Sequence, residues 1–249
     1  MIAAKKPKIL VFDIETLGLK ANDPLLCIAW KVFGEDKINF RATWNSVRWA
    51  QLKAAKTPKA IETAFQNLDK DILADVYEEF STADCLVGHY ETYFDVPFLK
   101  SRLIKHGYGF LPKSQLTDTW FILRKNLALR SNRLGAVNEF LGIEKKLKQN
   151  DLSLWTAVKT GSRAAFKLME KYNKQDVIAT ESLLRRLIGY AKLPRPFIDG
   201  IRQCQCGSRA VERHSIRSTM TGVYQRYRCR SCGSYSKSLI KKPELRPES

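Results

Sequence analysis

The sequence predicts an α/β protein, with a mixed β-sheet flanked by helices and a small C-terminal module that a metal holds together. Three strand patterns come first, and helical patterns then alternate with further strands, which is the element order of such a sheet. Four of the six cysteines cluster late in the chain, beyond Pro194 and Pro196. The 249 residues suffice for one mid-sized domain with an apolar core and a small appendage.

The expected strands are short apolar runs. Ile9 to Phe12 is uninterrupted, which is typical of a strand buried on both faces. Gly34, Glu35 and Asp36 form a turn between the second and third strands. The predicted strands cover residues 9–12, 26–33, 37–40 and 85–87, and a short extended segment ends at Asp118.

The expected helices are segments in which apolar residues recur every three or four positions. Pro97 opens one of them, at a position where its missing N–H does no harm. The last helix carries Asp176 on its apolar face. The helical patterns cover residues 61–80, 97–105, 121–127, 134–141, 152–158 and 165–187.

The charge favours a polyanionic partner. The chain has 43 Lys and Arg against 25 Asp and Glu, a net charge of +18, and residues 191–249 hold 13 basic and 4 acidic residues. Nucleic acid is the commonest polyanion in cytoplasm, although a solubility surface remains open for the first 190 residues. No apolar run of about 18 residues and no secretory signal pattern is found, so we expect a cytoplasmic protein without a membrane span.

Four carboxylates are candidate metal ligands. Asp13 and Glu15 lie two apart at the end of the first strand, so they share a face, where a divalent cation would offset their repulsion. Asp95 lies between a buried strand and the Pro97 helix. Asp176 lies on a buried helical stripe and needs a partner or a metal. The alternatives are a solvated strand end, a helix cap at Asp95 and a buried ion pair at Asp176.

These motifs resemble the DEDD superfamily of 3′–5′ exonucleases, in its tyrosine subclass, over about residues 8–190. The resemblance implies a ribonuclease-H-like fold. One position departs from it, because Tyr90 stands where many members carry Asn. The matching motifs are Asp13-Ile14-Glu15, Phe94-Asp95 and Tyr172-Asn173-Lys174-Gln175-Asp176.

The resemblance also implies hydrolysis with two Mg²⁺ or Mn²⁺ ions. Asp13 would bridge both ions, Glu15 and Asp176 would hold the ion that carries the attacking water, and Asp95 would reach the other through water. Tyr172 would orient or deprotonate that water.

Two further residues, His89 and Asp118, could also belong to the site. His89 is expected to be a packing or hydrogen-bonding residue rather than a catalyst. Asp118 is a rival metal ligand at a strand end, ranked lower because the motif spacing does not need it.

The four late cysteines predict one structural Zn²⁺. Cys204 and Cys206 form a tight first knuckle, and Cys229 and Cys232 form a second with the usual spacing. The segment resembles a zinc ribbon, which is too small to fold without such a staple. His214 is the one nearby substitute ligand, and free thiols are the alternative.

Basic and aromatic residues beside the second knuckle are candidate nucleic-acid contacts. Tyr224, Arg226, Arg228 and Arg230 alternate rings and cations, which suits bases and phosphates. Alternatively, the tyrosines form the small core of the ribbon.

The sequence therefore predicts a 3′–5′ exonuclease acting on nucleic acid, with DNA favoured and a single-stranded 3′ end as substrate, from a bacterium or a phage. A nucleic-acid-binding protein with a vestigial site and a structure-specific endonuclease remain alternatives. No protein partner can be inferred. The expected parts are an exonuclease domain at 1–190, a linker at 191–200, a zinc ribbon at 201–240 and a mobile tail at 241–249.

Overall fold

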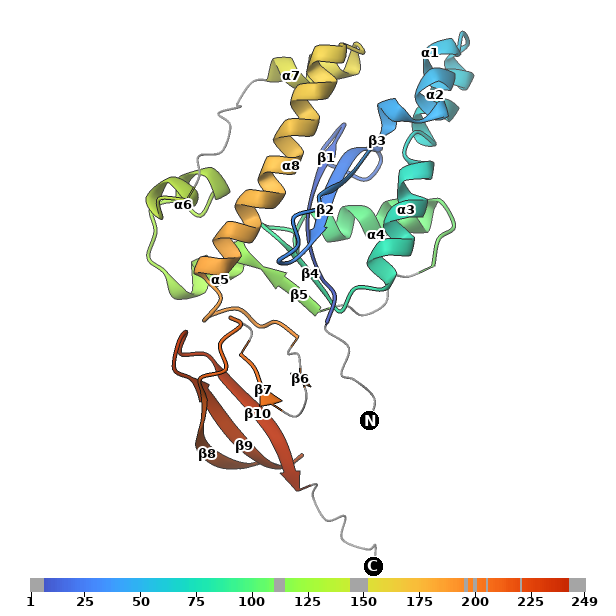
Figure 1. The fold of residues 1–249 in the computed structure, drawn as a ribbon. Helices are drawn as coiled ribbons and strands as arrows, with labels where there is room; N and C mark the ends of the chain where they lie inside the picture. The colour runs from blue at the N-terminus through green and yellow to red at the C-terminus, as the bar shows by residue number, and fades with distance from the viewer. Residues whose placement is uncertain are drawn as a thin grey trace, which may run out of the picture.

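The protein folds into a sheet-and-helix body and a separate C-terminal sheet (Figure 1). The structure, a computed structural model, describes residues 7–109, 115–143, 152–194, 197–198, 201–204, 206–219 and 221–241. All but the first residue of the expected tail lies outside them. No helix in these ranges is long and apolar enough to span a membrane.

A five-stranded mixed sheet forms the centre of the body, in the order β3-β2-β1-β4-β5. The first three strands of the chain pair antiparallel, and β4 and β5 extend the sheet parallel to β1. The predicted mixed sheet is thus confirmed, with the third strand two residues later than expected. The strands are β1 (Ile9–Thr16), β2 (Leu25–Val32), β3 (Asn39–Ala42), β4 (Cys85–Gly88) and β5 (Gln115–Asp118).

The helices mostly follow the predicted patterns, with three corrections. Neither η1 nor α1 was expected, α4 begins at Asp95 rather than Pro97, and the 61–80 pattern is broken into two helices. The helices are η1 (Thr43–Asn45), α1 (Val47–Ala54), α2 (Pro58–Gln66), α3 (Lys70–Ser81), α4 (Asp95–Lys105), α5 (Thr119–Asn126), α6 (Leu134–Phe140), α7 (Leu152–Lys159) and α8 (Arg163–Arg186).

The alternation of side chains along β1 decides which helix each residue meets. Leu10 and Phe12 pack in the cluster formed with α3 and α4, whereas Ile9 and Val11 pack with α8 on the opposite face. Figure 1 shows α8 on one side of the sheet and α3 and α4 on the other. Because Asp13 continues the odd-numbered series, β1 directs its side chain towards α8.

A buried ion pair lies at the break between α2 and α3. Asp69 accepts hydrogen bonds from Leu25 N at 2.7 Å and from Arg102 Nε and Nη2 at 2.8 and 2.6 Å. Both side chains are fully buried, and His106 Nε2 lies 3.1 Å from the same carboxylate. Burial alone would raise the pKa of Asp69, but the hydrogen bonds from His106 and Arg102 and the arginine charge lower it. The position of Asp69, fixed by these contacts, explains why one long helix does not form.

We expect Arg102→Ala to lower the free energy of unfolding by about 3–5 kcal/mol, because it leaves the Asp69 charge buried without its main partner. The measurement is denaturant unfolding followed by circular dichroism. The control is Arg48→Ala, since Arg48 pairs with Asp71 at the surface and such pairs contribute about 1 kcal/mol or less. Equal losses in the two variants would contradict the assignment.

The C-terminal part is a three-stranded antiparallel sheet in the order β10-β9-β8, preceded by a short hairpin. It touches the body just beyond α8: a methyl group added to Gly189 would lie 2.7 Å from the carbonyl oxygen of Cys232. The backbone of the second knuckle therefore packs directly on the turn after α8. The strands are β6 (Phe197–Ile198), β7 (Ile201–Arg202), β8 (Val211–Thr219), β9 (Gly222–Cys229) and β10 (Tyr235–Lys241).

Candidate functional site

Three of the predicted carboxylates converge at the end of β1. One ligand oxygen each from Asp13, Glu15 and Asp176 can be chosen so that all lie within 4.8 Å of one another. The alternation of β1 presents the first two to α8, and Asp176 lies on the face of α8 that packs against β1, where it is 4% exposed. Three hard oxygen ligands from two distant segments form a donor set that fits Mg²⁺ or Mn²⁺.

Asn173 was missed by the sequence analysis. Its Nδ2 donates to Asp13 Oδ2 at 2.7 Å and to the backbone oxygen of Asp13 at 3.1 Å. It lies one turn before Asp176 on the same helix, so the two side chains point the same way. The sequence feature that could have identified Asn173 is an amide side chain on the buried face of the last helix, three positions before Asp176.

Asp95 lies next to this cluster but not within it. Its carboxylate accepts the backbone N–H of Ile14, which lies between Asp13 and Glu15, at 3.3 Å. Asp95 is the first residue of α4, whose N-cap is Phe94, so Asp95 does not occupy the capping position. Burial raises the pKa of Asp95 to about 7, and the nearby charge of Asp118 adds to the shift.

Tyr172 is placed one turn before Asp176, as the helical spacing requires. Its side chain is 8% exposed and packs edge-on against Trp155, with ring centroids 6.3 Å apart. The ring therefore has a fixed orientation beside the helix face that carries Asp176.

The two neighbouring residues prove to be structural. Asp118 accepts backbone N–H groups from Tyr90, Thr92 and Trp120, which ties the segment after β4 to the start of α5. It is not part of the carboxylate cluster. His89 is hydrogen-bonded through both ring nitrogens, to Thr119 Oγ1 and to the backbone oxygen of Asn132, which confirms the expected hydrogen-bonding role.

Glu91 is a second buried acid that the sequence analysis did not single out. It is fully buried, and it lies against Gly88, where an added methyl group would be 2.8 Å from its Cβ. Burial raises the pKa of Glu91 to about 10, and the negative charge of Asp118 adds to that shift. Glu91 is therefore neutral in the folded protein at physiological pH.

The raised pKa of Glu91 determines how the free energy of unfolding changes with pH. From the usual pKa of 4.5 up to about 10, the folded state keeps a proton that the unfolded state has released. The free energy of unfolding therefore falls as pH rises, by at most about 1.4 kcal/mol per pH unit from this group. We expect Glu91→Gln to remove this loss, so its stability relative to the parent should improve from pH 5 to pH 8.

Parallel urea titrations across this pH range, without added divalent cations, provide the measurement. The matched control is Glu78→Gln, because Glu78 is exposed on α3. If the stability difference between Glu91→Gln and the parent does not change with pH, the assignment of Glu91 as a buried neutral acid is refuted.

The four late cysteines form one cluster. Cys204 Sγ lies 3.5 Å from Cys232 Sγ, and Cys206 Sγ lies 3.7 Å from Cys229 Sγ. A disulfide would require about 2.05 Å. Thiolates at 2.3 Å around a tetrahedral Zn²⁺ would instead lie about 3.8 Å apart, so the cluster fits zinc. His214, the substitute ligand left open by the sequence, is not part of the cluster.

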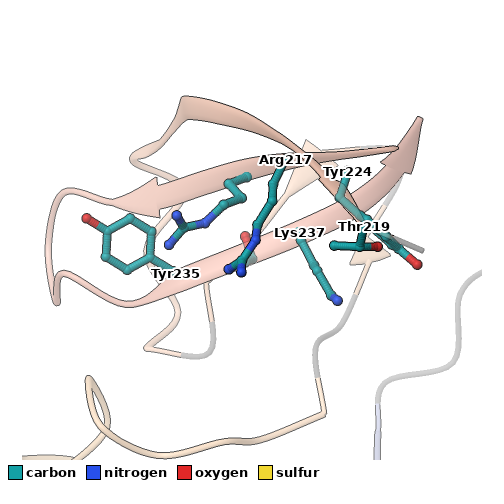
Figure 2. Close-up of a pocket in the computed structure, with 7 residues that line it drawn as sticks. Arg217, Thr219, Tyr224, Tyr235 and Lys237 are labelled. Carbon is teal, nitrogen blue, oxygen red and sulfur yellow. The ribbon is translucent and has the colours of Figure 1, made fainter. Parts of the chain in front are cut away.

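One face of the C-terminal sheet forms a groove of about 580 Å³ (Figure 2). The strand alternation and register bring basic and aromatic side chains from all three strands to this face. Arg226 lies over the Tyr235 ring, 4.9 Å from its centroid, and Lys237 lies over Tyr224 at 4.3 Å. The lining residues are Arg217, Thr219, Tyr224, Arg226, Tyr235, Ser236 and Lys237.

Two of the four predicted contacts, Tyr224 and Arg226, therefore line the groove. Arg228 extends the same face by alternation but lies outside the lining, and Arg230 is paired with Glu212 at 2.7 Å. Arg217, Tyr235 and Lys237 were missed because they lie on other strands, and only the register brings them to β9. The alternative of a tyrosine core does not fit Tyr224, whose ring lines an open groove.

Comparisons with known proteins agree with the fold of the body. The model of the RNase H superfamily matches residues 10–188, from β1 to just past α8. The structure is similar to the family B DNA polymerase from the hyperthermophilic archaeon Pyrobaculum calidifontis, with a TM-score of 0.53 and 18% identity. The similarity covers 74% of this chain and 25% of the polymerase, so this chain spans about a quarter of the polymerase's length. A search of curated proteins found no match. The fold expected from the resemblance is confirmed.

Proposed function

This chain belongs to the RNase H superfamily, and from that premise we propose that it is a metal-dependent nuclease that shortens nucleic acid from the 3′ end. The observation that carries the proposal is the convergence of Asp13, Glu15 and Asp176 in that fold. Hydrolysis of a phosphodiester requires stabilisation of developing negative charge, which carboxylates alone would oppose. The cluster is therefore suited to the reaction only as a cation site.

Asp13, Glu15 and Asp176 would hold divalent cations, with Asp95 as the fourth carboxylate. When bound, two such ions would polarise the phosphoryl oxygens and lower the pKa of an attacking water. Asn173 holds Asp13 in place by donating to its Oδ2 and would keep that carboxylate oriented towards the cations. Tyr172, whose ring packs against Trp155, would orient the attacking water through its hydroxyl.

The test is degradation of a single-stranded oligonucleotide labelled at its 5′ end, with Mn²⁺ added. Removal from the 3′ end gives a ladder of progressively shorter labelled products. Cuts in a closed circular strand would instead support an endonuclease, and tight binding without cleavage would support a vestigial site. Matched DNA and RNA oligomers test the preference for DNA that we propose.

We further propose that the C-terminal sheet binds the same substrate through Tyr224, Arg226, Arg228 and Arg230. The groove supports this proposal because cations and aromatic rings line one face, as phosphates and bases require. Arg230 has the weakest support of the four, since Glu212 already pairs with it.

We expect Arg226→Ala to weaken oligonucleotide binding at low salt and to reduce the slope of log affinity against log salt by about 0.7. The reason is the loss of one phosphate contact with its released counterion. The measurement is fluorescence anisotropy at several salt concentrations. Arg48→Ala, distant in the fold and paired with Asp71, is the control, and an unchanged slope for Arg226→Ala would contradict the contact.

A further inference from the structure

A cluster of aromatic rings, two of them exposed and two half-buried, lies beside the carboxylates and has no role in the site described above. Tyr90 and Tyr93 come from the segment between β4 and α4, and Trp120 and Phe121 from the start of α5. Ring centroids are 5.1 Å apart for Tyr90 and Trp120, and 5.1 Å for Tyr93 and Phe121. The side chains of Tyr90 and Tyr93 are 43% and 57% exposed, which is unusual for packed aromatic residues.

The backbone at Tyr90 is strained. Among the described residues it is the one non-glycine residue with a positive φ, at 75°. That conformation suits Gly or Asn and is a true outlier for a bulky side chain. The N–H of Tyr90 is held by Asp118 Oδ1 at 2.9 Å, so the surrounding structure imposes the conformation. Such strain concentrates at functional positions, and here it supports an exposed ring.

The surface around the rings is positively charged. The segment 119–138 contains four basic residues and no acidic residue. Arg124 lies over the Trp120 ring at 5.2 Å from its centroid, and the backbone oxygen of Asn132 is held by His89, next to Tyr90. The four exposed cations are Arg124, Lys125, Arg130 and Arg133.

The position of the cluster relates it to the cation site. Tyr93 precedes Asp95 by two residues, and the carboxylate of Asp95 reaches the backbone of β1 between Asp13 and Glu15. Exposed rings with cations around them provide stacking for bases and charge for phosphates, a combination that single-stranded nucleic acid requires. A protein partner would not require four charges of the same sign around a planar aromatic surface.

We propose that Tyr90, Tyr93 and Trp120 form a stacking platform for the bases of single-stranded nucleic acid next to the carboxylates. The platform rests on the proposed nuclease function and identifies where the substrate lies. The strain at Tyr90 is the cost of presenting a ring where an Asn would fit the backbone better.

The first experiment measures binding of a thymidine tetranucleotide to the full chain without added divalent cations. Tyr93→Ala should lower its affinity about tenfold, since stacking contributes 1–3 kcal/mol per base. An abasic oligomer of equal length should bind the parent and the variant equally. Phe140→Ala is the control, because Phe140 is 71% exposed on α6, outside the platform.

Tyr90→Asn distinguishes a binding role from a packing role. The platform predicts lower affinity together with an unchanged or higher melting temperature, because Asn relieves the strain. A lower melting temperature with unchanged affinity would assign Tyr90 to packing and overturn the proposal.

Photo-cross-linking locates the bases directly. An oligonucleotide with 5-iodouracil at its 3′ end should cross-link to the peptide segments that contain Tyr90, Tyr93 or Trp120. Cross-links confined to the C-terminal sheet, or equal binding of abasic and base-bearing oligomers by the parent, would overturn the platform. None of these measurements needs cleavage, so failure of the nuclease proposal would appear separately, as a missing ladder.

Discussion

Asp176→Asn is expected to lower phosphodiester hydrolysis on the order of 10³-fold or more while leaving oligonucleotide affinity within about twofold. The substitution keeps the shape of the side chain but removes one of three negative charges whose oxygens lie within 4.8 Å of one another. Cation affinity should fall with it, and the charge stabilisation that hydrolysis requires should fall as a result. Rates and affinities are measured on the same labelled oligomer, with and without Mn²⁺.

A second readout separates loss of the cation from loss of folding. Mn²⁺ should raise the melting temperature of the parent, because a ligand that binds only the folded state stabilises it. That rise should be largely absent in Asp176→Asn. Asp71→Asn, on the surface of α3, is the matched control and should keep both turnover and the Mn²⁺ effect. Unchanged turnover in Asp176→Asn would refute the catalytic assignment.

Removing zinc is expected to unfold β8, β9 and β10 while the five-stranded sheet of the body persists. Cation binding by four thiolates contributes about 10–16 kcal/mol in small zinc modules, which exceeds what a short three-stranded sheet provides by itself. Apolar burial in this part of the structure is small: Cys204 and Cys229 are the buried apolar residues described beyond residue 200. Hydrogen exchange with and without a strong chelator measures the effect by segment.

Metal analysis provides the stoichiometry, with about one zinc per chain expected. Cys232→Ser should lower zinc content and protection in the C-terminal sheet. Cys85→Ala should leave both unchanged, because Cys85 is buried in β4, within the body. If a preparation contains no zinc and β8 to β10 are still protected from hydrogen exchange, zinc does not stabilise this sheet.

The parts of the fold predicted correctly are those governed by local periodicity. The apolar run at Ile9 and the alternation that follows it were sufficient to place Asp13 and Glu15 on one face, and the helical spacing was sufficient for Asp176. The break before α3 was not predictable, since it depends on Arg102, which is distant in sequence from Asp69. The ion pair is visible only once α4 packs beside α3.

The same limit applies to the sites. Asn173 and Glu91 act through neighbours on other elements, so their roles follow from the fold rather than from spacing. The groove depends on strand register, which no residue of β9 reveals by itself. At Tyr90 the sequence did provide a signal, a departure from the expected Asn, but its meaning required the positive φ and the ring contacts.

Because Gly189 packs against Cys232, the length of α8 sets the distance between the carboxylates and the C-terminal sheet. The helix carries Asp176 near its middle and ends at Arg186, roughly 15 Å further along its axis at 1.5 Å per residue. A stacked strand advances about 3.4 Å per nucleotide, so a chain that reaches from the carboxylates to the second sheet must exceed about four nucleotides. If both parts bind the substrate, as we propose, oligomers below that length would engage one end of the molecule and longer ones would engage both.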